Sequence, residues 1–226
     1  IKSKSAHMMT IKEEVLHVSP IFPVHRVIAK DEEGRDIVKS RVAIDITALN
    51  KISTTYHTNH AYSMEQNLAR LAGCRYFSTT DIRSYFYTIP LDKESQKFGG
   101  ITWFDEDGRA RVAVMDRAPM GAKDAPKFGQ YITSKEIGDK IENSAVCQDD
   151  ITIGAVTVER IIENTFRMIV KCAELNARLA PDKTIIASTT TETAGFIISE
   201  KGYVPMPRIK TKAFCANVER LKNVKE

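Results

Sequence analysis

The sequence predicts an α+β fold in which helices pack on one face of a small antiparallel sheet. Two helical patterns, at residues 124–141 and 158–179, alternate with short runs of β-branched and apolar residues that are typical of strands. Two polar turns that contain glycine, Asp31–Gly34 and Asp105–Gly108, each lie between two such runs. Because a tight hairpin joins antiparallel neighbours, we expect the sheet to be antiparallel.

The bulk composition is that of an ordinary globular protein. The chain has 226 residues, of which 42% are hydrophobic and 27% charged, which suits one large domain or two small ones. The net charge of +4 permits a nucleic-acid partner but does not by itself indicate one. No apolar run approaches the roughly 20 residues that span a bilayer, and no signal-peptide pattern opens the chain. We therefore expect no membrane partner.

The cysteines Cys74, Cys147, Cys172 and Cys215 are widely spaced, and none belongs to a Cys-x-x-Cys pair. This spacing predicts reduced, mostly packed thiols in an intracellular, reducing compartment. The chain begins at Ile1 rather than at a methionine and stops in a charged run. We therefore expect it to be a piece of a longer protein.

The first hairpin is expected from residues 21–29 and 37–46, and two prolines, Pro20 and Pro23, interrupt its first strand. Because proline has no N–H to donate to a neighbouring strand, this strand is predicted at a sheet edge.

A short helix is expected next, since Ser63 and Gln66 form a capping-box pattern and Gly73 supplies a C-terminal stop. Residues 75–82 then predict a strand that ends at an acidic residue.

Apolar residues follow a helical period in both long helices. In the first they are Phe128, Ile132, Ile137 and Ile141, and in the second they are Val158, Ile161, Ile162, Thr165, Ile169, Cys172 and Leu179. Four further short strands are predicted at residues 145–147, 151–153, 184–187 and 195–198.

An acidic pair, Asp149 and Asp150, follows Gln148 between two apolar triplets of β type. Two adjacent carboxylates repel each other, and a divalent cation such as Mg²⁺ would offset that cost. A solvated hairpin turn is the simpler explanation of the dipeptide when it is considered alone. Asp81, which closes an apolar strand, is by itself most simply a cap or turn residue.

The motifs become specific when their order is considered together. They lie at residues 19–24, 41–51, 75–89, 118–126, 146–151, 179–183, 195–198 and 222–226. In this order the chain resembles the reverse transcriptases, most closely those of gypsy-type LTR retrotransposons and retroviruses.

The resemblance implies the fingers and palm of a right-hand polymerase. The implied parts are a mobile lead-in (1–18), fingers (19–74), palm (75–116), a fingers loop with a palm helix (117–143), palm with the acidic hairpin and primer grip (144–210), and the start of a connection to a thumb (211–226). A thumb and an RNase H domain are missing from this chain and are expected partners.

The implied reaction is RNA-directed DNA synthesis, in which a primer 3′-hydroxyl attacks the α-phosphate of a dNTP. Two Mg²⁺ ions about 3.5–4 Å apart, with Mn²⁺ as an alternative, would activate the attacking oxygen and stabilise the leaving one. The resemblance assigns Asp81, Asp149 and Asp150 as the catalytic carboxylates and metal ligands. The backbone carbonyl of Ile82 would be a further ligand.

Five residues are implied to contact the nucleotide: Lys30, Arg41, Phe86, Met120 and Lys183. An aromatic ring at Phe86 would leave no room for a 2′-hydroxyl, which favours dNTPs over rNTPs. An ordinary core aromatic and a surface lysine are the alternative interpretations of Phe86 and Lys183.

Primer and template contacts are implied at Cys147, Gln148, Gly195 and Phe196. The chain departs from the family pattern at three positions. The family usually has Tyr at the position of Cys147 and a small or apolar residue at that of Gln148, and it has Gln or Phe at that of Met120. These changes remove no metal ligand, but they place the rate and fidelity of the enzyme in doubt.

The leading hypothesis is a polymerase core that binds an RNA or DNA template with its primer, and dNTPs. We expect it in a cytoplasmic element particle or in the nucleus, either as a monomer or as a dimer. A catalytically silent, domesticated palm that binds nucleic acid or a protein partner is the main alternative. A viral RNA-dependent RNA polymerase is a third hypothesis, which Phe86 disfavours.

Overall fold

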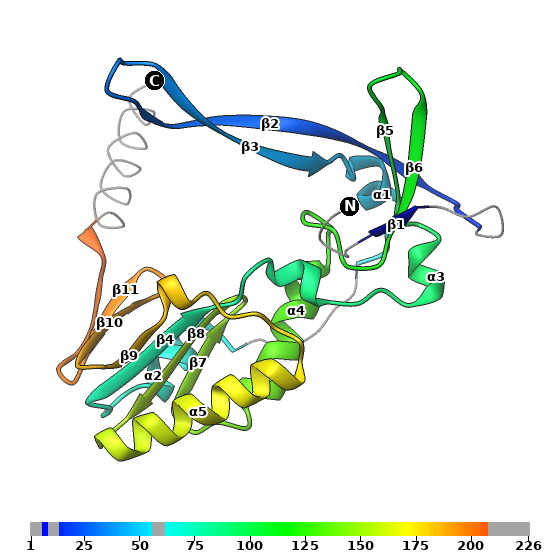
Figure 1. Ribbon diagram of the computed structural model, residues 1–226. Helices are drawn as coiled ribbons and strands as arrows, with labels where there is room; N and C mark the ends of the chain where they lie inside the picture. Colours follow the sequence, from blue (N-terminus) through cyan, green and yellow to red (C-terminus); the bar gives the residue numbers. More distant parts are fainter. Residues whose placement is uncertain (1–5, 9–13, 56–61, 208–226) are drawn as a thin grey trace, which may run out of the picture. The chain divides into compact units, whose positions relative to one another are not determined.

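A computed structural model describes residues 6–8, 14–55 and 62–207. The chain divides into two compact units, unit 1 (1–57 and 86–129) and unit 2 (58–85 and 130–226), and each is treated separately (Figure 1). The expected thumb connection at 211–226, Cys215, and the lead-in at residues 1–5 and 9–13 lie outside the described residues.

Unit 1 is built on a five-stranded sheet with the order β1-β6-β5-β2-β3 among the described residues. Its elements are β1 (Ala6–Met8), β2 (Val18–Lys30), β3 (Asp36–Ile44), α1 (Thr47–Ile52), α3 (Lys93–Gln96), β5 (Gly100–Phe104) and β6 (Ala110–Met115), while η1 (Tyr85–Thr88) and α4 (Ala125–Thr133) each begin in one unit and end in the other. Strands β2 and β3 pair antiparallel, as do β5 and β6. Both predicted hairpins are therefore confirmed.

The prediction that the first hairpin strand lies at a sheet edge is confirmed for residues 21–29 but not for the start of β2, since β2 lies between β5 and β3 in the sheet order. Its first residues, Val18 to Pro20, pair in parallel with β5, and the remainder pairs with β3. From Ile21 onward β2 has a partner on one side only. Pro23 is therefore tolerated where the strand has no second neighbour that needs its N–H.

Unit 2 holds a four-stranded sheet with the order β7-β8-β4-β9 and a three-stranded sheet with the order β10-β11-β12 in its described part. Its elements are α2 (Met64–Arg70), β4 (Tyr76–Asp81), the π-helix η2 (Ser134–Gly138), β7 (Ser144–Cys147), β8 (Asp150–Ala155), α5 (Val158–Glu174), η3 (Pro181–Lys183), β9 (Ile185–Ser188), β10 (Thr190–Thr193), β11 (Phe196–Ser199) and β12 (Gly202–Pro205). The pairs β7–β8, β8–β4 and β4–β9 are all antiparallel. This confirms the predicted α+β class with an antiparallel sheet.

The four-stranded sheet is covered on both faces. Helix α5 lies along one face (Figure 1), where Thr165 donates a hydrogen bond to the Ser78 hydroxyl of β4 (2.8 Å). On the opposite face Phe77 is fully buried in a cluster with Leu71, which follows α2, and Ile198 of β11. The three-stranded sheet thus covers a face of the four-stranded sheet for which the sequence predicted no covering element.

The short helix α2 has the predicted capping box. Ser63 accepts a hydrogen bond from the Gln66 backbone N–H, and the Gln66 side chain accepts one from the Ser63 N–H. Gly73 follows the helix with φ +77°, as expected of a C-terminal stop.

The predicted apolar stripes of both long helices are partly wrong. Helix α5 ends at Glu174 rather than near residue 179, and the side chains it buries are Ile161, Asn164, Thr165, Met168 and Cys172. Helix α4 continues as a π-helix, and the continuous segment buries Gln130, Thr133, Ser134 and Ile137. The predicted stripe residues that are buried are Ile137, Ile141, Ile161, Thr165 and Cys172. Those that are exposed are Phe128, Val158, Ile162 and Ile169, whereas the polar Gln130 and Asn164 are buried without having been predicted.

Three strands, β1, β10 and β12, were not predicted from the sequence. None of the helices in the described parts of the chain is long and apolar enough to cross a lipid bilayer.

The close packing of β8 against Cys74 generates a stability prediction. A Cβ at Gly154 would lie 2.6 Å from the Cys74 Sγ and 2.8 Å from its Cβ. We expect Gly154→Ala to lower the free energy of unfolding by about 1–3 kcal/mol through overpacking. Gly138→Ala is the control, because its nearest neighbour would lie 3.7 Å away. Equal unfolding midpoints of the two variants in urea would contradict the prediction.

Candidate active site

The three aspartates expected at the active site lie at one end of the β4–β8 pair. Asp81 is the last residue of β4 and stands directly opposite Asp150, the first residue of β8. Opposite residues of antiparallel strands have Cβ atoms roughly 4.5–5.5 Å apart. Asp149 occupies the adjoining turn, and its carbonyl accepts a hydrogen bond from the Ile82 N–H (2.8 Å). The strand register therefore brings together residues far apart in the sequence.

The acidic turn between β7 and β8 is held from one side by Gln130. This turn consists of Gln148 and Asp149, and Gln148 has φ +56°, a conformation that costs a non-glycine residue about 1–2 kcal/mol. The Gln130 amide accepts a hydrogen bond from the Gln148 N–H (2.6 Å) and donates one to the Val146 carbonyl (2.9 Å). These bonds fix the turn in a strained conformation.

Asn67 braces the same strand from α2. Its amide donates to the Val146 carbonyl (3.2 Å) and accepts from the Val146 N–H (3.3 Å). Strand β7 is the last in its sheet, so Asn67 satisfies edge groups that would otherwise be buried without a partner. Neither Asn67 nor Gln130 was predicted from the sequence. Asn67 lies on the same helical face as the apolar residues Met64, Leu68 and Leu71. A polar residue on an apolar face was the signal that could have identified it.

Asp150 is held by the hairpin that joins β10 to β11. Its carboxylate accepts hydrogen bonds from the Thr193 hydroxyl and the Ala194 N–H, both at 3.3 Å. Ala194 and Gly195 form the two-residue connection with φ of +46° and +89°, the pattern of a type I′ turn. This turn directs a backbone N–H at the carboxylate.

Burial raises the pKa of Asp150 above its ordinary value. The two hydrogen bonds oppose this effect by favouring the ionised form, while the nearby carboxylates of Asp149 and Asp81 add to it. A positive ion placed among these groups would favour ionisation of all three.

Such a positive charge is already present on Lys183 of η3. Its ammonium lies 2.8 Å from Asp81 Oδ2, and Asp81 raises the pKa of Lys183. The lysine side chain is 59% exposed, so solvent screens the pair and its contribution to stability is small. Asp81, Asp150 and Lys183 line a cavity of about 510 Å³ together with Thr193 and Gly195.

The remaining primer and template candidates lie around the same sheets. Cys147 pairs with Asp150 across the β7–β8 turn, and burial followed by the neighbouring carboxylates raises the pKa of its thiol. The Gly195 carbonyl accepts a hydrogen bond from the Met206 N–H (3.0 Å). The Phe196 ring meets Tyr203 edge to face with centroids 5.6 Å apart.

The other nucleotide candidates belong to unit 1. Lys30 ends β2 and pairs with Asp36 at 3.6 Å, and Arg41 is an exposed residue of β3 opposite Val24. Phe86 is half-buried in η1, and Met120 is exposed in the loop that precedes α4.

The donor set fits a hard divalent cation, because Asp81, Asp149 and Asp150 supply carboxylate oxygens. Within the described residues, however, no group of three or more His, Cys, Asp or Glu side chains is arranged to hold a metal ion. Lys183 engages Asp81, and Thr193 engages Asp150. The carboxylates of Asp81 and Asp150 are thus adjacent, but each of these two is directed to a protein partner.

The sequence of this chain matches a known protein family over most of its length. Residues 28–198 match the model of the reverse transcriptase (RNA-dependent DNA polymerase) family. The matched segment is more than half of the chain and contains all three aspartates. This chain belongs to the reverse transcriptase family. The predicted family is confirmed, whereas the gypsy-type group remains a prediction.

Relatives of this reverse transcriptase domain include the retrovirus-related Pol polyprotein from transposon 297 of Drosophila melanogaster, which is 27% identical over 83% of this chain and 17% of the polyprotein. A foamy viral protease-reverse transcriptase in complex with double-stranded DNA has a TM-score of 0.72 and 23% identity, over 93% of this chain and 34% of that chain. The same viral enzyme in complex with an RNA/DNA hybrid has a TM-score of 0.69 and 23% identity, over 89% and 25%. The chain therefore spans only a small part of these proteins.

The raised pKa of Asp150 makes the stability of the reverse transcriptase domain depend on pH. Ionised Asp150 costs folding free energy above its raised pKa, and this cost disappears as the pH falls through that pKa towards the ordinary aspartate value. We expect Asp150→Asn to raise the free energy of unfolding at neutral pH, and this gain to vanish in acid.

Urea unfolding of wild type and Asp150→Asn at neutral pH and in acid, without divalent ions, measures this difference in stability. In the control variant Asp182→Asn the free energy of unfolding at neutral pH should fall rather than rise, because Arg83 lowers the pKa of Asp182. A stability gain at Asp150→Asn that persists unchanged in acid would contradict the assignment.

Lys183 should compete with a metal ion for Asp81. We expect Lys183→Gln to tighten Mn²⁺ binding severalfold, because the variant removes the ammonium that pairs with Asp81 Oδ2. Titration of Mn²⁺ followed by electron paramagnetic resonance measures the affinity, and Lys201→Gln in the β11–β12 turn is the control. Unchanged or weaker Mn²⁺ binding by Lys183→Gln would show that the lysine does not compete.

Proposed function

We propose that this reverse transcriptase domain is the core of an RNA-directed DNA polymerase that transfers deoxynucleotides to a primer 3′-hydroxyl. The observation that carries the proposal is the register of β4 and β8, which sets Asp81 opposite Asp150 and beside Asp149. Adjacent carboxylates at one sheet end are the ligand type that nucleotidyl transfer requires.

In this proposal Asp81, Asp149 and Asp150 hold two Mg²⁺ ions, or Mn²⁺ in their place. Bound there, the ions would increase the nucleophilicity of the primer hydroxyl and stabilise charge on the leaving pyrophosphate. The protein prepares for this by keeping Asp150 in place through Thr193 and Ala194. These two hydrogen bonds offset part of the cost of holding three negative charges together.

Lys183 has two roles in the proposal. Without nucleotide it neutralises part of the negative charge at Asp81. When cations take over that task, its flexible and largely exposed ammonium is released to meet the triphosphate, to which it is able to donate a proton. The raised pKa of Lys183 in its pair with Asp81 keeps the proton on the amine until then.

Unit 1 would supply the remaining nucleotide contacts. Arg41 and Lys30 are exposed basic residues on the β2–β3 hairpin and suit a triphosphate. We assign Phe86 as the ring that excludes a 2′-hydroxyl, and Met120 as a contact beside it.

The proposed partners follow from the family. The foamy viral relatives were solved with double-stranded DNA and with an RNA/DNA hybrid, which supports a template–primer duplex for this chain. The long Pol polyprotein of transposon 297 supports thumb and RNase H domains supplied by a parent protein. A cytoplasmic element particle or the nucleus is the proposed location.

Primer extension on an RNA template, with the chain inside its full-length parent, tests the proposal. We expect Asp81→Asn to lower the rate by at least about a thousandfold, because metal binding loses a charged ligand. Asp182→Asn is the matched control, since Asp182 is an exposed carboxylate one residue from Lys183. Absence of extension by the wild-type parent, or equal loss in both variants, would overturn the catalytic assignment.

The same assay separates the alternatives. A catalytically silent palm is favoured by the partners that already engage Asp81 and Asp150, and it predicts no extension and no Mn²⁺ binding. An RNA polymerase predicts equal use of rNTPs and dNTPs, whereas Phe86 predicts strong preference for dNTPs.

A further inference from the structure

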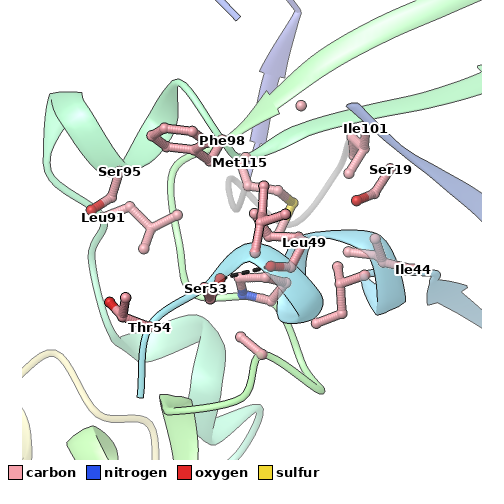
Figure 2. Close-up of a pocket in the computed structure, with 16 residues that line it drawn as sticks. Ser19, Ile44, Leu49, Ser53, Thr54, Leu91, Ser95, Phe98, Ile101 and Met115 are labelled. Atoms are coloured by element: carbon pink, nitrogen blue, oxygen red, sulfur yellow. Dashed lines mark hydrogen bonds between the residues drawn. The ribbon is translucent and has the colours of Figure 1, made fainter. Parts of the chain in front are cut away.

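Unit 1 contains an uncharged cavity of about 420 Å³ that none of the assignments above uses. Figure 2 shows Leu91 and Phe98 on one side of it, with Leu49 and Ile44 on the other. Ile101 and Met115 of the central strands also line it. None of the lining residues in the described chain carries a charge. The walls come from α1, β3, α3, β5 and β6.

The lining determines which chemistry the cavity accepts. A site for a nucleotide or a nucleic-acid backbone needs cations or clustered N–H donors, and this one offers mainly aliphatic and aromatic surface. Its polar groups are hydroxyls, of which Ser53 already donates to the Leu49 carbonyl (2.8 Å). The exposed Thr54 and Ser95 are left at the rim to bind one polar group of a ligand.

The size of the cavity supports a small molecule. An apolar cavity of about 150 Å³ accommodates benzene, and pockets for small ligands measure about 300–1,000 Å³. The observed volume therefore suits a molecule of two or three fused or linked rings. Water would be poorly held there, because few polar partners are available.

One wall of the cavity is the loop that carries Met120. Pro119 and Ala122 line the cavity on either side of Met120, which itself is 58% exposed. Asn50 of α1 ties this loop down by donating to the Gly121 carbonyl (3.0 Å) and accepting from the Lys123 N–H (2.9 Å). A ligand between α1 and this loop would therefore press on the segment that holds Met120.

We infer that the cavity is a binding site for a neutral, mainly apolar small molecule with one hydrogen-bonding group. Occupancy sets the position of the Pro119–Ala122 loop. Its effect on the reaction rests on the proposed role of Met120 in nucleotide binding, whereas binding itself does not. Filling the cavity is expected to change the KM for dNTP more than kcat.

The test uses 2-naphthol as the probe and naphthalene-2-sulfonate as its charged counterpart, with affinities from calorimetry on the 226-residue chain. We expect 2-naphthol to bind at least about tenfold more tightly, because the cavity cannot solvate a sulfonate. Thr54→Trp and Ser95→Trp, both at the exposed rim, should each weaken 2-naphthol binding by about tenfold or more. Val42→Trp on the exposed face of β3 is the control.

The outcomes are distinct from those of the polymerase assay. Absence of 2-naphthol binding, equal binding of both probes, or equal binding by wild type and both rim variants overturns the inference. Binding to this chain but not to its full-length parent also overturns it, because a protein segment then fills the cavity. Calorimetric binding with an unaltered dNTP KM leaves the site in place but removes its link to Met120.

Discussion

The antiparallel register between β4 and β8 is the constraint on which the candidate active site depends. A shift of one residue would move Asp81 away from Asp150 and turn each side chain of the shifted strand to the opposite face. Phe77 would leave its fully buried position, and Ser78 would lose Thr165. The apolar and polar contacts of β4 therefore specify the same alignment that gathers the carboxylates. The same register is therefore required both for packing of the core and for assembly of the site.

Two buried side-chain amides hold strand β7, which carries the acidic turn, in place. Asn67 and Gln130 reach the same Val146 carbonyl from two different helices, and Gln130 also holds the Gln148 N–H. Unsatisfied buried polar groups cost about 1–3 kcal/mol each, so this network fixes both helices against β7. The π-helical continuation of α4 begins at Ser134, one turn after Gln130, and such turns are frequent near functional sites.

Local signals in the sequence were sufficient for much of the fold. The capping box at Ser63 and both glycine-containing hairpin turns act over a few residues, and each forms as predicted. Apolar periodicity found only part of the buried faces of the long helices, such as Ile137 and Ile161, because polar side chains such as Gln130 and Asn164 are also buried there. For the site, Asp81 and Asp150 were identified by family resemblance. Their partners Lys183 and Thr193 depend on three-dimensional pairing that no local pattern records.

The arrangement around Asp150 shows a balance between stability and chemistry. Gln148 holds a left-handed conformation, and Asp150 is buried near two like charges, so both residues oppose folding. Compensation comes from elements distant in sequence: Gln130 at the turn, the Thr193–Ala194 hairpin at the carboxylate, and Lys183 at Asp81. The contacts at Asp150 and Asp81 are hydrogen bonds and an ion pair to carboxylate oxygens, which are the atoms that a hard cation also prefers. Hydrophobic contacts at the same positions would leave these polar groups without partners, which costs about 1–3 kcal/mol for each buried group. Polar partners therefore allow the sheet to gather three aspartates at one end and still fold.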